Sequence, residues 1–122
     1  MMERAAIIAT INTYCRVQSE KDENGWAALF TEDVLHEDPV GIGRSMRGKN
    51  HVVGAFWDSI VRNEVRIWLE DEIIVCGNEA LAIMACDIGP NNARRRLSPV
   101  VDHFVFADDG RISSVRGFYN LS

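Results

Sequence analysis

The chain has 122 residues, the usual size of one domain, and its 47% hydrophobic and 25% charged residues are typical of a globular protein. A formal net charge of −5 argues against nucleic acid or an anionic membrane surface as a partner, because both attract basic faces. No segment approaches the roughly 20 consecutive apolar residues that cross a bilayer.

The first half of the chain has the periodicity of helices, with Tyr14 on the apolar face of the longest one. A polar stretch ends that helix, and Asn24 can cap the next. The expected elements are, in order, a helix over 3–19, a short helix over 25–30, a turn and short extended segment over 31–39, a loop over 41–48 and a helix over 50–61.

The second half reads as four strands, over 65–76, 80–88, 95–107 and 111–120. The breaks between them are short and carry turn residues, so neighbouring strands should pair antiparallel. Helices followed by strands predict one α+β domain over 1–122, with three helices on one face of a curved sheet. Such a sheet encloses a cone, and this composition makes the cone mostly apolar, as small-molecule sites are.

Two aspartates and a tyrosine are candidates for chemistry. Asp38 precedes Pro39, which restricts it to extended geometry, so its carboxylate can project into the mouth of the cone. Asp102 lies mid-strand on the same face as Val100 and Phe104, where burial should raise its pKa and keep it a neutral donor. Taken singly, each has a plainer interpretation: a solvated turn for Asp38, an arginine partner for Asp102, and simple ring burial for Tyr14.

Together these three positions resemble the bacterial ketosteroid isomerases. The stretch Glu37-Asp38-Pro39-Val40-Gly41 is similar to the family's base motif, and Val101-Asp102-His103-Phe104 is similar to the strand that carries its protonated acid. Tyr14 lies on the first helix, as in the family, and the likeness extends from about Ile8 to Asn120.

The resemblance implies a cone-shaped, NTF2-like fold with a mostly antiparallel sheet, and a homodimer packed through the sheets. It implies an enzyme that moves a steroid double bond from the 5,6 to the 4,5 position next to a 3-ketone, with no cofactor and no metal. Asp38 would move the proton while Tyr14 and a protonated Asp102 hold the enolate oxygen. A carboxylic acid kept neutral by an apolar site is a known feature of this family, and the resemblance assigns that role to Asp102.

Several other residues are expected near the site. Trp57 stands where relatives often carry a tyrosine that supports Tyr14, but an indole can donate and not accept. His36 either approaches the pocket or is an ordinary satisfied or exposed histidine, and the run 94–96 is either a solvated strand end or a binder of an anionic substituent. The expected substrate-binding residues are Phe30, Phe56, Trp57, Met84, Val100, Phe104, Phe118 and Tyr119.

Two further functions stay open at this point. One is a polyketide cyclase or dehydratase of the same SnoaL-like superfamily, and the other is a small-ligand-binding module without catalysis. An epoxide hydrolase is less favoured, because that chemistry needs an Asp-Arg-Asp set. The three cysteines fit neither a zinc site nor a redox pair, and the first residues do not resemble a secretory signal, so we expect a cytoplasmic protein.

Overall fold

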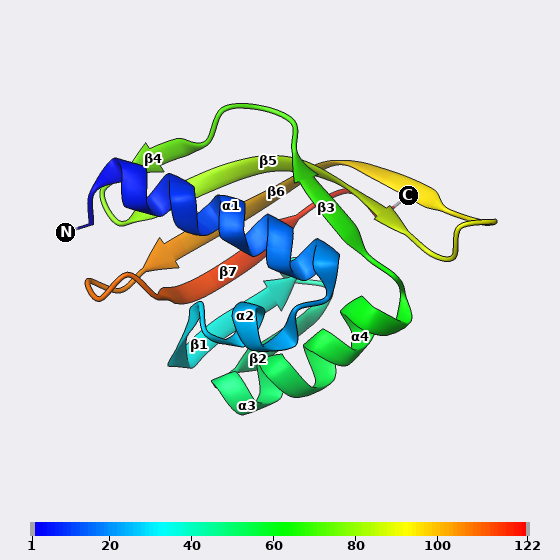
Figure 1. The fold of residues 1–122 in the computed structure, drawn as a ribbon, viewed down its shortest axis with the longest axis horizontal. Helices are drawn as coiled ribbons and strands as arrows, with labels where there is room; N and C mark the ends of the chain where they lie inside the picture. The colour runs from blue at the N-terminus through cyan, green and yellow to red at the C-terminus, as the bar shows by residue number, and fades with distance from the viewer. Residues whose placement is uncertain (1, 122) are drawn as a thin grey trace.

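The longest helix, α1 (Arg4–Glu20), crosses in front of the sheet (Figure 1). The structure is a computed structural model and describes residues 2–121. The other helical elements are α2 (Glu23–Ala27), α3 (Lys49–His51), the π-helical segment Val52–Phe56 and α4 (Trp57–Arg62). The strands are β1 (Phe30–Asp38), β2 (Arg44–Arg47), β3 (Arg66–Leu69), β4 (Ile74–Cys76), β5 (Glu79–Ile88), β6 (Arg95–Phe106) and β7 (Ile112–Phe118).

The strands form one seven-stranded sheet in the order β2-β1-β7-β6-β5-β3, with β4 also paired to β5. Strands β1 and β7 are parallel, and every other strand pairing within residues 2–121 is antiparallel. The helices cover one face of this curved sheet, and α2, α3 and α4 lie beside its β1–β2 end (Figure 1). The predicted α+β class, with helices on a curved and mostly antiparallel sheet, is therefore confirmed.

The N-terminal part contains more strand than the sequence predicted. Asp22, and not Asn24, caps the short helix by accepting a hydrogen bond from the Gly25 backbone at 2.9 Å, and that helix ends at Ala27. Strand β1 then begins at Phe30, and the expected loop over 41–48 contains β2, which pairs with β1 as a hairpin. These strands were hard to predict because most of their side chains are polar and β2 is an exposed edge strand.

The expected strand over 65–76 is two strands. β3 pairs with the far part of β5 and β4 with its beginning, and the acidic residues Glu70, Asp71 and Glu72 lie between them, exposed. Consecutive carboxylates favour solvent over a sheet ladder, so the chain leaves the sheet there. The expected helix over 50–61 is likewise divided by its π-helical segment.

The core lies between α1 and the sheet. Ile7, Ile11 and Tyr14 recur at helical spacing and are buried, which explains how α1 docks. Trp26 and Phe30 follow and pack edge to face, with ring centroids 4.7 Å apart. Burying each large apolar side chain contributes roughly 1.5–3 kcal/mol, so these two residues anchor the C-terminal end of α2 and the start of β1. No helix within residues 2–121 is long and apolar enough to span a bilayer.

Candidate active site

Three neighbouring strands bring two carboxyl groups together. Asp102 on β6 is paired with Gly117 on β7, and the parallel register of β1 places Asp38 on the other side of the same glycine. A Cβ built on Gly117 would lie 2.8 Å from Oδ1 of Asp38 and 3.2 Å from Oδ1 of Asp102. Asp38, Gly117 and Asp102 thus form a row across three neighbouring strands. The two carboxyl groups face each other over Gly117, the residue of this row that has no side chain.

Tyr14 reaches the same space from α1. Its ring packs edge to face on Phe104, with centroids 5.2 Å apart, and on Phe30 at 6.3 Å. Tyr14, Asp38 and Asp102 all line one cavity of about 340 Å³, whose walls are otherwise largely aliphatic and aromatic. The structure thus gathers the three residues singled out in the sequence around one apolar cavity.

The expected substrate-binding residues divide into three groups. Phe56, Met84, Val100 and Tyr119 line the cavity. Phe30, Trp57 and Phe104 are buried behind its walls in the core and do not line it. Phe118 is wrong as a wall residue: it is 43% exposed and lies outside the cavity, because strand alternation turns Gly117 and Tyr119 inward and Phe118 outward.

The two carboxyl groups differ in how strongly their surroundings raise their pKa values. Burial raises the pKa of Asp102 well above the ordinary carboxyl value, and the charge of Asp38 raises it further. Burial also raises the pKa of Asp38, but a hydrogen bond from the Tyr119 hydroxyl acts in the opposite direction by stabilising the carboxylate. Asp102 therefore holds a proton more strongly than Asp38, which is how an acid and a base can coexist in one cavity.

Tyr14 remains a protonated donor. Burial and then the charges of Asp102 and Asp38 raise the pKa of its hydroxyl well above the ordinary value, while a side-chain hydrogen bond with Trp26 opposes the rise. The Trp26 indole also donates to the Gln18 side chain at 3.2 Å. Trp57 stands where relatives often carry a tyrosine that supports Tyr14, so a different support was expected. The indole that acts on the Tyr14 hydroxyl is that of Trp26, whose ring centroid lies 6.4 Å from the Tyr14 ring and which the sequence analysis did not single out.

His36 belongs to the cavity wall. Only 2% of it is exposed, and its ring lies 3.7 Å from the ring of Phe56 between centroids. Burial lowers the pKa of His36 to about 3, so the imidazole is neutral. Of the two interpretations made from the sequence, the one that places His36 at the pocket agrees with the structure.

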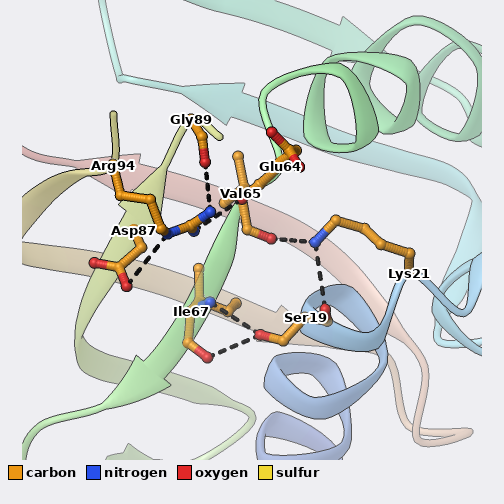
Figure 2. Close-up of polar contacts among 8 residues, drawn as sticks. All are labelled: Ser19, Lys21, Glu64, Val65, Ile67, Asp87, Gly89 and Arg94. Carbon is orange, nitrogen blue, oxygen red and sulfur yellow. Dashed lines mark hydrogen bonds and ion pairs between the residues drawn. The ribbon is translucent and has the colours of Figure 1, made fainter. Parts of the chain in front are cut away.

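The basic run 94–96 does not line the cavity, and its first member has a structural role. Arg94 donates to the backbone carbonyls of Gly89 and Glu64 and lies 3.7 Å from a carboxylate oxygen of Asp87 (Figure 2). Arg96 pairs with Glu70 at 2.7 Å. Figure 2 shows that Arg94 ties the start of β3 to the β5–β6 turn, so its guanidinium is occupied.

A second set of contacts holds β3 against the end of α1. Lys21 donates to the carbonyl of Val65, and the Ser19 hydroxyl bridges the backbone N–H and C=O of Ile67, at 2.9 and 3.0 Å (Figure 2). Val65 and Ile67 both line the cavity. These polar contacts therefore fix one apolar wall in place.

The sequence analysis missed several polar residues around the cavity. They include Gln18 on α1, Arg44 on β2, Ser59 on α4 and Asn63 just after it. Gly117 was also missed, although a glycine inside a strand is a recognised sign of close approach by another group. Among residues 2–121, no group of three or more His, Cys, Asp or Glu side chains is arranged to hold a metal ion.

Replacing Gly117 with alanine is expected to reduce any reaction that uses both carboxyl groups by roughly 10- to 100-fold, since displacements near 1 Å can have effects of this size. The added methyl would meet the Asp38 carboxyl at 2.8 Å and push it aside. Turnover and thermal midpoint should be measured together. Gly54→Ala is the matched control, because a Cβ there meets nothing within 4 Å. Equal turnover by both variants would contradict the interpretation that Gly117 leaves the room in which the two carboxyl groups lie.

Replacing Asp102 with asparagine is expected to stabilise the fold at neutral and alkaline pH. The folded-state pKa of Asp102 is raised, so between the ordinary carboxyl pKa and that raised value the folded state binds more protons than the unfolded state. Wild-type stability attributable to this group therefore falls as pH rises through that window. Urea unfolding of both proteins at acid, neutral and alkaline pH should show the variant's advantage growing with pH. A difference that is constant with pH would contradict the raised pKa.

Comparison with known proteins agrees with this fold. The family model of the SnoaL-like domain matches residues 11–115, and the chain belongs to that family. The chain is 25% identical to the epoxide hydrolase/cyclase-like enzyme SalBIII of pyran ring formation in the polyether salinomycin, with a TM-score of 0.88 over 99% of this chain and 95% of that one.

Two mycobacterial structures are also similar. RV0760c from Mycobacterium tuberculosis, solved with estradiol-17beta-hemisuccinate, is 25% identical with a TM-score of 0.84, covering 95% of each chain. The Delta 5-3-ketosteroid isomerase from Mycobacterium sp. is 25% identical with a TM-score of 0.81, covering 95% of this chain and 94% of that one. The structural neighbours of this chain thus include enzymes, and one of them was solved with a bound steroid derivative.

Proposed function

We propose that this protein is a cofactor-independent isomerase that moves the double bond of a 3-oxo-Δ5-steroid, or a similar flat apolar ketone, into conjugation. The observation that carries the proposal is the convergence of Asp38, Asp102 and Tyr14 on one apolar cavity. A volume of about 340 Å³ is within the range of small-molecule sites. Similarity to a ketosteroid isomerase and to a steroid-bound structure supports the same substrate class.

In the proposed reaction, the Asp38 carboxylate removes a proton from the carbon between the ketone and the double bond. The C–H electron pair forms a new carbon–carbon double bond, and the carbonyl electrons move onto oxygen to give a dienolate. The protonated Asp38 then returns the same proton two carbons away, and the ketone re-forms. No atom is gained or lost, so one carboxyl group suffices as base and then acid.

Tyr14 and Asp102 are proposed to stabilise the dienolate oxygen. Both are held protonated by burial, so both can donate hydrogen bonds to an oxygen that becomes negative. Donors aimed at developing charge in a cavity shielded from water act most strongly in the transition state. An ionised Asp102 would instead repel the enolate, which is why its raised pKa matters for this mechanism.

The direct test is ultraviolet monitoring of 5-androstene-3,17-dione incubated with the protein. A conjugated enone absorbs where the starting ketone does not, so the absorbance should rise at a rate proportional to enzyme concentration. The Asp38→Asn protein serves as the negative control for contaminating activity. A wild-type rate no higher than that control would reject the isomerase proposal.

A cyclase or dehydratase is the second candidate, and the acid–base difference between Asp102 and Asp38 favours it as well. A protonated carboxyl can activate a leaving or ring oxygen while a carboxylate removes a hydroxyl or carbon-bound proton. Similarity to a cyclase-like enzyme of polyether biosynthesis supports this reading. Arg44 lines the same cavity and is the cross-strand partner of Asp38, but among residues 2–121 no ion pair joins its guanidinium to either carboxyl.

We also propose a homodimer through the outer face of the sheet, in a reducing cytoplasm. Leu81 and Phe118 are large apolar side chains exposed on outward-facing strand positions, which supports an interface there. The cysteines Cys15, Cys76 and Cys86 are unpaired thiols, as is usual in a reducing compartment. Light scattering of wild type against Leu81→Lys should show a dimer that the substitution weakens; a monomeric wild type would reject this arrangement.

A further inference from the structure

The mechanism proposed above gives no role to His36, a buried polar residue that lines the cavity. His36 is two residues before Asp38 on β1 and therefore faces the same side of the sheet. It is the preceding residue of β1 whose side chain points toward the cavity. The register places His36 beside Val115 and, across β7, beside Phe104, and neither of these two lines the cavity. His36 therefore marks the inner end of the cavity, beyond the row formed by the two carboxyl groups.

The polar atoms of His36 have no partner within the protein. Its side chain is buried, and neither Nδ1 nor Nε2 forms a hydrogen bond with any of residues 2–121. Its ring instead lies between aromatic neighbours, 3.7 Å from Phe56 and 6.3 Å from Trp26 between centroids. Buried polar groups are hydrogen-bonded in nearly all proteins, so two unpartnered nitrogens on a cavity wall point to a bound molecule as their partner.

The protonation of His36 restricts what that partner can be. A neutral imidazole has one N–H donor and one lone-pair acceptor, and the two can exchange places between tautomers. An anionic group has no charge to pair with on this ring. A hydroxyl group is suited to both tautomers, because its oxygen can accept from the N–H and its hydrogen can be donated to the other nitrogen.

We infer that His36 is a specificity-determining residue that hydrogen-bonds a hydroxyl group on the ligand. This hydroxyl is a second oxygen, separate from the ketone or enolate oxygen to which Tyr14 and Asp102 donate. The ligand class is then a flat apolar ring system with two oxygen substituents at the end that enters the cavity first. The inference rests on the proposed function only for the placement of the first oxygen. Ligands without the hydroxyl leave the imidazole unpartnered and should bind more weakly.

The test uses binding and does not require turnover. The probes are 2-naphthol, a planar mimic of a dienolate with one oxygen, and the isomeric dihydroxynaphthalenes that each add one hydroxyl to it. Calorimetric titration of the wild-type protein should find at least one isomer that binds roughly tenfold tighter than 2-naphthol, the effect of about one good hydrogen bond. In His36→Phe, which keeps a flat ring against Phe56, that preference should fall to about twofold or less.

The matched control is His51→Phe, the same substitution at an exposed histidine outside the cavity, which should keep the wild-type preference. A readout that needs no variant is the ¹⁵N spectrum of the wild-type imidazole, in which the preferred isomer, and not 2-naphthol, should shift the His36 ring nitrogens. The inference is overturned if no isomer exceeds 2-naphthol in the wild type, if the preference survives in His36→Phe, or, should that variant not fold, if the ring nitrogens do not respond. A His36-dependent preference without enone formation from the steroid would keep this inference and reject the isomerase.

Discussion

Replacing Asp38 with asparagine is expected to lower kcat for the proposed isomerisation by roughly 10²–10⁴-fold, the usual contribution of a general base. An amide has nearly the same shape as the carboxyl but cannot take up the proton. The side chain faces Gly117 and lines the cavity together with Tyr119, so a substitution that keeps its shape should leave the cavity intact. Binding of 2-naphthol should therefore stay within a few-fold of wild type while turnover is lost.

The neighbouring carboxylate offers a matched control. Glu37 is the preceding residue of β1, but it points away from the cavity and pairs with Arg116 at 3.0 Å. Glu37→Gln should keep near-normal turnover, because it removes a carboxylate from the same strand without touching the site. Near-normal turnover by Asp38→Asn, or equal losses in both variants, would reject Asp38 as the base.

The pH dependence of turnover provides a second check on Asp38. The carboxylate is the reactive form of a base, and burial raises the pKa of Asp38. The value of kcat/KM should therefore fall as pH decreases, with a midpoint above the ordinary carboxyl pKa of about 3.9. An acid limb at or below that ordinary value would contradict the burial of the base.

Removing the proposed donor Asp102 is the other large expected effect. Asp102→Ala should lower kcat by roughly 10²–10³-fold, the loss seen when one donor to a developing oxyanion is deleted. Asp102→Asn keeps an N–H donor in nearly the same place and should retain much of the activity. The comparison of these two variants isolates the hydrogen bond from the charge, because both remove the carboxyl group.

A control for nonspecific effects is Asp109→Ala, which removes an exposed carboxylate from the turn before β7 and should leave kcat unchanged. Carboxyl-selective NMR of the wild type should find Asp102 still protonated at pH values where exposed carboxyls are ionised, because burial and the charge of Asp38 raise its pKa. Equal activity of Asp102→Ala and Asp102→Asn, together with titration near pH 4, would make Asp102 a structural residue.

The fold class and the identity of the candidate groups could be predicted from the sequence, because those signals are local. Helical spacing on α1 predicts which way Tyr14 faces, and period-two alternation on β6 predicts that Asp102 shares a face with Val100 and Phe104. Both patterns extend over only a few residues of chain. The same alternation, applied to β7, would also have excluded Phe118 once Tyr119 was placed inside.

How these groups come together could not be predicted from the sequence, because it depends on non-local strand pairing. The parallel pairing of β1 with β7 joins segments far apart in the chain, and it is this register that sets Asp38 against Gly117. No local pattern encodes a pairing of that kind, since it depends on how the whole sheet closes around α1. The contact of Trp26 with Tyr14 and the unpartnered ring of His36 arise in the same way. Side-chain identity is thus read from the sequence, whereas the neighbours that tune each side chain are supplied by non-local packing.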